Sequence, residues 1–275
     1  MRIIANGLSI FHLIMNSYRS KKSLGQHFLT DTNIATKIVA SLYAKDVNAV
    51  VEIGPGRGIL TRDLVKNSQY DTYLVEIDGA LVEQLSQSFP ELKHRILHAD
   101  FLKLDISGSF KGPIAIIGNF PYNISSQIFF KILENRDNVV EVVGMVQKEV
   151  AERIKTGPGS KTYGILSVLL QAYYHVEYLF TVNEKVFDPP PKVKSAVIRL
   201  TRNKIETLDC DETLFFRLVK TGFNQRRKIL RNSLRSILLN LRLDHELMLR
   251  RPEELSVSQF VSLTRLVKGI LQTKK

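Results

Sequence analysis

The feature that most constrains the fold is an alternation of short apolar runs with amphipathic stretches in the first half of the chain. The amphipathic stretches, 59–67 and 80–89, carry apolar residues at helical spacing. Continuous apolar runs rich in β-branched residues are typical of strands buried on both faces of a parallel sheet. Four such runs occur, at 49–54, 72–78, 95–100 and 113–119. Their order predicts a β-α-β-α-β unit.

Segments on either side extend this unit. Residues 31–43 follow a capping pattern at Thr30 and Asp31 and keep apolar residues on one helical face, which predicts a helix before the first strand. Further strands are predicted at 139–147, 175–182 and 195–200. The expected fold class is therefore α/β, with a Rossmann-like, doubly wound sheet of seven strands.

A change in composition at residues 201–212 marks the expected domain boundary, because this stretch is polar, charged and without apolar periodicity. The segments after it are amphipathic at helical spacing, and none of them reads as a strand. They cover 215–223, 227–241 and 256–271. We expect an N-terminal extension over 1–20, an α/β domain over 21–202 and a small all-helical domain over 203–275.

The N-terminus and the cysteine content suggest the compartment. Residues 1–20 lack a small-residue cleavage site, so a secretory signal is not expected, and we hypothesise an upstream extension with Met15 as the natural start. Every apolar run is shorter than the roughly 20 residues that cross a bilayer, so no membrane span is expected. The single cysteine, Cys210, excludes an intramolecular disulfide and a cysteine-cluster zinc site. We expect a cytoplasmic protein without a metal site.

The net charge of +12 favours polyanionic partners such as nucleic acid or acidic lipid. Residues 204–275 contain 15 Lys and Arg against 8 Asp and Glu, so they carry more than half of this charge. Charge alone leaves open a basic protein that binds no nucleic acid.

A candidate cofactor site follows the first three predicted strands. Gly54, Gly56 and Gly58 come directly after the first strand, where glycines let a backbone pass close to a ligand, although a tight strand-to-helix turn also explains them. Glu76 ends the second strand, where a carboxylate can accept hydrogen bonds from ribose hydroxyls. Asp100 ends the third and could accept one from an adenine amino group. Together they favour an adenosyl cofactor over a nicotinamide cofactor, for which the GxGxG spacing is wrong.

The segment Asn119-Phe120-Pro121-Tyr122 follows the fourth strand. The N6 amine of adenine is a poor nucleophile because its lone pair is delocalised into the ring. If the Asn119 side-chain oxygen and a backbone carbonyl near Pro121 accept the two amine hydrogens, the lone pair is directed towards a methyl donor. Tyr122 can stack on the purine. The segment predicts methyl transfer to adenine, and a β-turn built on Asn and Pro is the structural alternative.

Eight sequence blocks together resemble the bacterial small-subunit rRNA adenine dimethyltransferase family, from about residue 19 to the C-terminus. They are KKSLGQHFL (21–29), VEIGPGRGILT (51–61), VEID (75–78), HADFL (98–102), GNFPYNISSQIFFKIL (118–133), VQKEVAERI (146–154), VFDPPPKVKSAVIRL (186–200) and FNQRRKILRNSL (223–234). The resemblance implies an S-adenosylmethionine-dependent methyltransferase domain and dimethylation of the N6 amines of two adjacent adenines. It also implies that these adenines lie in a hairpin loop near the 3′ end of 16S rRNA and that the reaction takes place during 30S subunit assembly.

The resemblance also implies roles for individual residues. This chain has His27 where the family commonly has Asn, and because both side chains form hydrogen bonds we expect the contact to be kept. Phe120 replaces a commoner Leu. Phe187 is implied to stack on the target adenine opposite Tyr122, with a core aromatic that anchors the proline turn as the alternative. Contacts to the methyl donor are implied for His27, Leu29, Gly54, Glu76, Asp100 and Asn119.

A basic segment after the domain boundary is the predicted RNA contact. We interpret it as one helix, in which Arg227, Arg231 and Arg235 share a face opposite apolar residues. Phosphates would neutralise the repulsion between these charges, although a solvated face is the plain alternative. The predicted RNA-binding residues are Arg226, Arg227, Lys228, Arg231 and Arg235, and Lys21 and Lys22 are expected to extend the surface.

Two alternatives stay open. A 23S rRNA methyltransferase of the macrolide-resistance type would share the fold and the Asn-x-Pro-aromatic turn, but the blocks at 187–197 and 223–234 look more like the small-subunit family. A non-catalytic RNA-binding assembly or transcription factor could use the same fold, but it would not need Glu76 and Asp100. The expected partner is 16S rRNA within the 30S subunit or its precursor, and the enzyme is expected to be a monomer.

Overall fold

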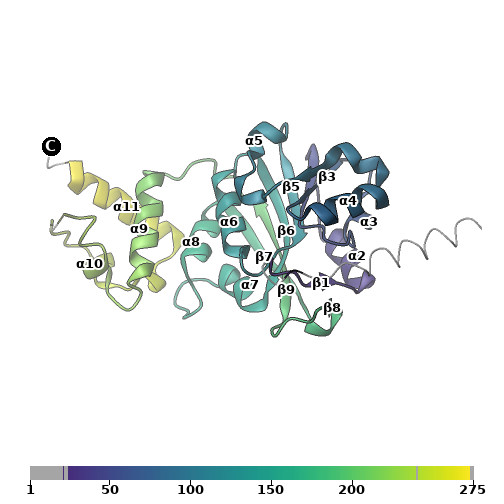
Figure 1. Cartoon of the computed structure of the whole chain (residues 1–275). Coiled ribbons are helices and arrows are strands. Elements are labelled where there is room, and N and C mark those ends of the chain that lie inside the picture. Colours follow the sequence, from purple (N-terminus) through teal and green to yellow (C-terminus); the bar gives the residue numbers. More distant parts are fainter. Residues whose placement is uncertain (1–20, 22–23, 240, 273–275) are drawn as a thin grey trace, which may run out of the picture. The chain divides into compact units, whose positions relative to one another are not determined.

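Seven strands form one sheet, in which five strands run parallel (Figure 1). The computed structural model describes residues 21, 24–239 and 241–272. The strand order is β4-β3-β2-β5-β6-β9-β7, and β9 is antiparallel to β6. The strands are β2 (Ala49–Ile53), β3 (Asp71–Glu76), β4 (Ile96–His98), β5 (Ile114–Asn119), β6 (Val139–Gln147), β7 (Tyr174–Val182) and β9 (Ser195–Arg202). The predicted Rossmann-like sheet of seven strands is confirmed, with β4 shorter than predicted.

Helices connect the parallel strands, as the amphipathic stretches predict. Figure 1 shows α6 on one side of the sheet and α2 and α3 on the other. Helix α2 begins as predicted, because the Asp31 carboxylate accepts hydrogen bonds from the N–H groups of Asn33 and Ile34. The helices up to β7 are α2 (Thr32–Ala40), α3 (Thr61–Leu64), α4 (Gly79–Ser88), α5 (Ile106–Ser109), α6 (Ser125–Glu134), α7 (Lys148–Lys155) and α8 (Ile165–Tyr173).

The strand order places a ligand site at a defined point. The chain runs outwards from β2 through β3 to β4, and then returns to continue on the other side of β2 with β5 and β6. In open α/β sheets of this kind, ligands bind outside the carboxyl ends of the strands, at the point where the order reverses. Gly54 follows β2 and Asn119 ends β5, so both lie at this switch point.

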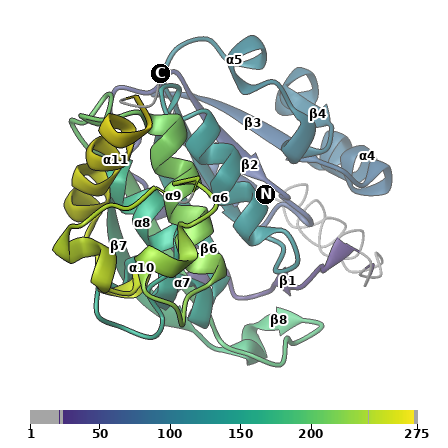
Figure 2. The same cartoon turned by 90° about the vertical axis from the view of Figure 1, so that its left-hand side faces the viewer.

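A two-stranded ribbon that the sequence did not predict lies beside the sheet. Strand β1 (Phe28–Leu29) pairs antiparallel with β8 (Phe187–Asp188), and Figure 2 shows the two segments near each other. The pairing continues at Thr30, whose N–H and hydroxyl both donate to the Val186 carbonyl. The N-terminal segment is thereby fixed against the loop that precedes β9.

Contacts between backbone positions divide the chain into two compact units. The first contains the described residues up to Lys148 together with Glu177–Thr201, and the second contains Glu149–Val176 and the described residues from Arg202 onwards. The change after Thr201 lies next to the expected boundary at 202, whereas 149–176 was expected in the first domain. This segment differs because α8 packs against α9 (Glu212–Asn224) and α11 (Val257–Gln272). The expected extension over 1–20 and the hypothesis about Met15 lie outside the described residues.

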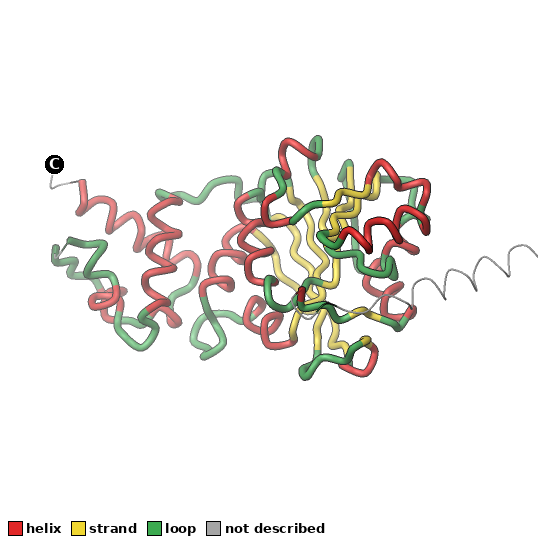
Figure 3. The backbone as a smooth tube through the Cα atoms, in the orientation of Figure 1, coloured by secondary structure: helices red, strands yellow, loops and turns green. Residues whose placement is uncertain are grey.

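The second unit is helical after β9, and Figure 3 shows helices and loops but no strand in this part of the described chain. Its elements are α9, α10 (Leu230–Ser233), the short 3-10 helices at Glu246–Leu249 and Pro252–Glu254, and α11. The prediction of one long helix over 227–241 is wrong. The Leu230 N–H donates to the Arg250 carbonyl at 2.8 Å, whereas a continuing helix would need it for residue 226. The helix therefore begins only at Leu230, after Ile229 in extended conformation, and Leu239, with φ +51, lies outside helical geometry before residue 241.

None of the helices in the described residues has the length and apolar character needed to cross a membrane.

Candidate active site

A cavity opens at the carboxyl ends of β2, β3, β4 and β5, where the strand order reverses. It is lined by the N-terminal segment and by the residues that follow each of these strands. The lining includes five of the six predicted cofactor residues, namely His27, Gly54, Glu76, Asp100 and Asn119. The sixth, Leu29, lines a smaller neighbouring cavity that shares Gly54, Gly56 and Asn119 with the first. The tertiary structure thus brings together residues from five separate parts of the chain.

The glycine turn after β2 needs its glycines for conformation and for space. Gly56 has φ +56, and a β-carbon there would lie 2.9 Å from the Phe28 ring. A side chain would therefore strain the backbone and displace Phe28, which lines the cavity. The Gly56 N–H donates to the Glu76 carboxylate at 3.2 Å. The turn therefore forms part of the cavity wall and donates a hydrogen bond to the Glu76 carboxylate.

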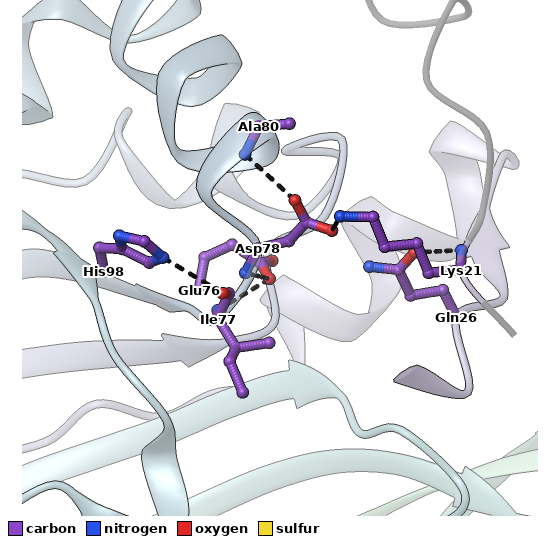
Figure 4. A network of polar contacts seen from close by, with 7 residues as sticks. All are labelled: Lys21, Gln26, Glu76, Ile77, Asp78, Ala80 and His98. Carbon is purple, nitrogen blue, oxygen red and sulfur yellow. Dashed lines mark hydrogen bonds and ion pairs between the residues drawn. The ribbon is translucent and has the colours of Figure 1, made fainter. Parts of the chain in front are cut away.

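Glu76 is buried at the end of β3 and points into the network of Figure 4. Its Oε1 accepts hydrogen bonds from the N–H groups of Ile77 at 2.9 Å and Asp78 at 3.0 Å. Burial raises the pKa of Glu76, and the three backbone donors oppose this shift because they stabilise the carboxylate. Oε2 accepts from the Gly56 N–H at 3.2 Å, and its second lone pair can accept a hydrogen bond from a hydroxyl.

Asp100 follows β4 and uses one carboxylate oxygen to cap a short 3-10 helix, Phe101–Lys103. Oδ1 accepts from the Leu102 N–H at 3.0 Å, while Oδ2 lies 3.8 Å from the Lys103 ammonium. The carboxylate is partly exposed and lines the cavity. Its second oxygen can accept a hydrogen bond from a ligand amine, as the sequence predicts.

Asn119 ends β5, and its amide is oriented by a contact that the sequence did not reveal. Nδ2 donates to the backbone carbonyl of His27 at 2.8 Å. A carbonyl oxygen only accepts, so the amide nitrogen must face His27 and Oδ1 is the atom left to accept from a substrate. The N-terminal segment therefore sets the orientation that the predicted chemistry requires.

The other three residues of the Asn-Phe-Pro-Tyr turn also line the cavity. The Phe120 ring is fully buried, and β-carbons at Gly118 or Gly144 would lie 3.2 Å and 2.6 Å from it. The Pro121 carbonyl accepts from the Ile124 N–H at 3.2 Å, which closes a turn. The segment therefore does form a turn, as the structural alternative predicts, and this does not exclude a catalytic role. A carbonyl has two lone pairs, so Pro121 can still accept a second hydrogen.

Tyr122 is held from two sides. Its hydroxyl forms a 2.5 Å hydrogen bond with the hydroxyl of Ser195, which is buried at the start of β9. Its ring lies 5.4 Å from the His27 ring, centre to centre. Nδ1 of His27 is 2.7 Å from the Pro189 carbonyl and must donate to it, so the two contacts fix both rings. Ser195 was missed as a site residue, because no local pattern connects it to Tyr122.

Phe187 does not line either cavity. It lies on β8, opposite Leu29, and is buried in the core cluster together with Leu29 and Val182. The alternative reading, a core aromatic beside the proline turn, describes its position here. Its stacking on adenine remains a prediction.

The predicted RNA-binding residues do not share one helix face. Arg226, Arg227 and Lys228 lie in the turn between α9 and α10, Arg231 lies in α10 and Arg235 follows it. Arg226 is only partly exposed: it donates to the Ser160 carbonyl at 3.1 Å and lies 3.8 Å from Glu253. The other four are exposed, and Arg231 lies 3.4 Å from Asp244. Lys22 lies outside the described residues.

Glu52 is a buried carboxyl beside the site that yields a testable pH dependence. It lies on β2, lines the smaller cavity and accepts from the Thr61 hydroxyl at 2.6 Å. Burial raises its pKa to about 8 from 4.5. The folded protein therefore holds this proton more tightly than the unfolded chain, so the stabilising contribution is complete below pH 4.5 and is lost as the pH rises to about 8.

We expect Glu52→Gln to remove this pH dependence, because the amide stays neutral and keeps an oxygen for Thr61. The loss in the original protein amounts to roughly 1.4 kcal/mol per pH unit within the window. The measurement is urea unfolding at several pH values from 5 to 9, with the substitution more stable than the original protein at the alkaline end. If the free energy of unfolding changed equally with pH in the two proteins, Glu52 would be ionised in the folded state and the prediction would be wrong.

The chain matches the model of the ribosomal RNA adenine dimethylase family over residues 17–267. It belongs to that family. It is an S-adenosylmethionine-dependent rRNA adenine methyltransferase, as the glycine turn, the two strand-end acids and the Asn-Phe-Pro-Tyr segment predict.

The sequence of this dimethylase is similar to those of two relatives over nearly their whole length. The chain is 57% identical over 252 residues to the ribosomal RNA small subunit methyltransferase A of Parabacteroides distasonis, covering 91% of this chain and 94% of that one. It is 54% identical over 257 residues to the protein of the same name from Cytophaga hutchinsonii, covering 93% of this chain and all of the other.

Solved structures share the fold of this dimethylase. A dimethyladenosine transferase from Plasmodium falciparum superposes with a TM-score of 0.73 at 22% identity, covering 89% of this chain and 98% of that one. The 23S rRNA methyltransferase ErmE superposes with a TM-score of 0.63 at 24% identity, covering 86% and 99%. At this identity the likeness establishes the methyltransferase fold.

The chemistry of the cavity fits S-adenosylmethionine. Glu76 offers a carboxylate oxygen for ribose hydroxyls and Asp100 one for the adenine amine, while the glycine turn brings backbone close to the ligand. Apolar residues that include Phe28, Ile77 and Phe101 also line the cavity.

Proposed function

We propose that this enzyme dimethylates the N6 amines of two adjacent adenines in the hairpin loop near the 3′ end of 16S rRNA. Membership of the rRNA adenine dimethylase family supports the reaction. The names of the relatives, ribosomal RNA small subunit methyltransferase A, support the small subunit as the source of the substrate. The observation that carries the proposal is the orientation of Asn119, whose Nδ2 is engaged by His27.

The residues of the turn do most of the proposed catalytic work. S-adenosylmethionine supplies an electrophilic methyl group. Asn119 Oδ1 accepts one hydrogen of the adenine amine and the Pro121 carbonyl accepts the other, which turns the nitrogen lone pair towards the methyl group. Tyr122 stacks on the purine, and its fixed ring keeps the amine in line for displacement. Transfer of the methyl group releases S-adenosylhomocysteine and leaves the amine nitrogen cationic. The nitrogen then loses one of its two protons to solvent, so a strong base is not needed.

The cofactor is held by the residues that line the two cavities. We propose contacts from His27, Leu29, Gly54, Glu76, Asp100 and Asn119, as the family resemblance implies. Phe187 is proposed to reach the second face of the adenine. Because it is buried on β8 here, this contact requires the loop after β8 to move when RNA binds.

We propose that RNA is bound by the exposed cations of the second unit, Arg227, Lys228, Arg231 and Arg235, with Arg226 in a supporting position. Their excess of positive charge is matched to a phosphate backbone. We propose that residues 21–202 act as the methyltransferase domain and that residues 203–275 act as the RNA-binding domain. The substrate is proposed to be 16S rRNA within the 30S subunit or its precursor, acted on by a monomer in the cytoplasm.

The proposal is tested by incubating the enzyme with labelled S-adenosylmethionine and 30S particles that lack the modification, followed by mapping of the labelled nucleotides. We expect two adjacent dimethylated adenines in the 3′ hairpin loop of 16S rRNA. Unmethylated 50S particles serve as the matched substrate control. Label on 23S rRNA would favour the macrolide-resistance type of methyltransferase, and label at a different 16S position would also contradict the proposal.

A further inference from the structure

The inference concerns an ion pair between the N-terminal segment and the turn that follows β3. Lys21 Nζ lies 2.6 Å from Asp78 Oδ2 (Figure 4). The Asp78 side chain is 1% exposed, while that of Lys21 is 52% exposed. An exposed ion pair contributes little, but a carboxylate withdrawn from water depends strongly on its partners. Loss of this ion pair should therefore disturb the structure around Asp78 more than loss of a fully exposed ion pair would.

Asp78 belongs to the turn that shapes the acid of the cofactor site. Its N–H donates to Glu76 Oε1 at 3.0 Å, next to the bond from Ile77 at 2.9 Å. Its Oδ1 accepts from the Ala80 N–H at 3.1 Å and caps helix α4. His98 Nε2, 3.2 Å from the Ile77 carbonyl, contacts the same turn from β4. A shift of Asp78 would therefore reach the Glu76 carboxylate through one peptide hydrogen bond.

Lys21 belongs to the segment that forms another wall of the cavity. Its backbone N–H donates to Gln26 Oε1 at 2.8 Å, and its carbonyl accepts from the Leu24 N–H at 3.0 Å. These bonds join Lys21 to the residues next to His27, and both Gln26 and His27 line the cavity. His27 in turn receives the Asn119 amide through its carbonyl. The position of Lys21 thus bears on the cofactor wall without Lys21 lining it.

We propose that Lys21 is a positioning residue for S-adenosylmethionine, which acts by tethering the N-terminal wall of the cavity to the Glu76 turn through Asp78. The proposal rests on the placement of the ribose at Glu76 given above. It differs from the expectation that Lys21 extends the RNA-binding surface, because its ammonium is directed to a buried carboxylate. The tether makes cofactor affinity, and not RNA affinity, the property that depends on Lys21.

The test measures cofactor binding and steady-state kinetics on the full chain. We expect Lys21→Ala to raise the Kd for S-adenosylmethionine and for S-adenosylhomocysteine about tenfold by calorimetry, the effect of losing one partly buried ion pair. At saturating cofactor, kcat and the KM for 30S particles should stay within about twofold of the original values. Lys21→Arg, which keeps the charge, should restore most of the affinity. Lys66→Ala, which removes one exposed lysine, is the matched control.

A thermodynamic cycle separates the tether from a general effect of charge. Asp78→Asn keeps an oxygen for the Ala80 N–H, and combining it with Lys21→Ala should weaken cofactor binding no further than either change does alone. Additive losses would overturn the proposal. So would an unchanged cofactor Kd in Lys21→Ala, including the case in which only the KM for 30S particles rises.

The same binding assay distinguishes failure of the tether from failure of the cofactor site. If Glu76→Ala weakens cofactor binding and Lys21→Ala does not, the tether is refuted while the site stands. If Glu76→Ala leaves binding unchanged, the ribose does not lie at Glu76 and both are refuted.

Discussion

Asn119→Ala is expected to lower the rate of methyl transfer by about 10²–10³-fold or more, the effect of removing one oriented polar group that acts in a transition state. The substitution removes Oδ1, the acceptor that would draw the amine hydrogen of adenine out of the ring plane. It leaves the strand-end acids and the glycine turn in place. Cofactor binding should therefore remain measurable, with at most a modest loss because Nδ2 no longer holds the His27 carbonyl.

Single-turnover methylation of 30S particles and calorimetric titration with S-adenosylhomocysteine give the two readouts for this variant. Asn135→Ala removes a comparable amide from the C-terminal end of α6 and serves as the control, with wild-type activity expected. Wild-type rates in Asn119→Ala would refute the mechanism. Loss of both rate and cofactor binding would instead place Asn119 mainly in the cofactor site.

Glu76→Ala is expected to weaken binding of S-adenosylmethionine by about 10–100-fold or more. A hydrogen bond to a charged group contributes about 1.5–3 kcal/mol, and a ribose hydroxyl would lose its acceptor. The backbone donors of Gly56, Ile77 and Asp78 also lose their partner, so the turn around the ribose loosens at the same time. Both effects act on cofactor affinity before any chemical step.

Calorimetry provides the measurement, and Glu83→Ala on the exposed side of α4 is the control for loss of a carboxylate. Circular dichroism establishes that Glu76→Ala is folded. Glu76→Gln keeps one oxygen and the shape of the side chain, so it should bind more tightly than the alanine substitution. Unchanged affinity in both variants would contradict the assignment of the ribose.

The pKa of Glu76 adds a pH dependence to this result. Burial raises the pKa above 4.5, and ribose hydroxyls are accepted best by the ionised form. The affinity of the original protein should therefore fall on acidification at a higher pH than an exposed glutamate would give. Glu76→Gln should not show this dependence.

Much of the fold and part of the site follow from local sequence patterns. The four parallel strands at the switch point and the start of α2 at Asp31 lie where the periodicity and the capping pattern predict them. Strand ends are also local features, so Glu76, Asp100 and Asn119 could be assigned to one edge of the sheet. The basic segment was misjudged because its apolar spacing suits a helix, whereas Leu230 bonds to Arg250 from a distant turn.

The sequence by itself determined which chemical groups meet at the switch point, because parallel strands deliver their carboxyl ends to one edge whatever surrounds them. Only the tertiary structure decided how these groups are oriented. Asn119 and His27 are 92 residues apart, yet their bond selects the amide oxygen that faces the substrate. Three other contacts also join residues far apart in the sequence. Ser195 forms a hydrogen bond with Tyr122, Asp78 forms an ion pair with Lys21, and Phe187 pairs with Leu29 on the neighbouring strand. Such contacts depend on the order of strands in the folded sheet, and short-range patterns do not encode that order.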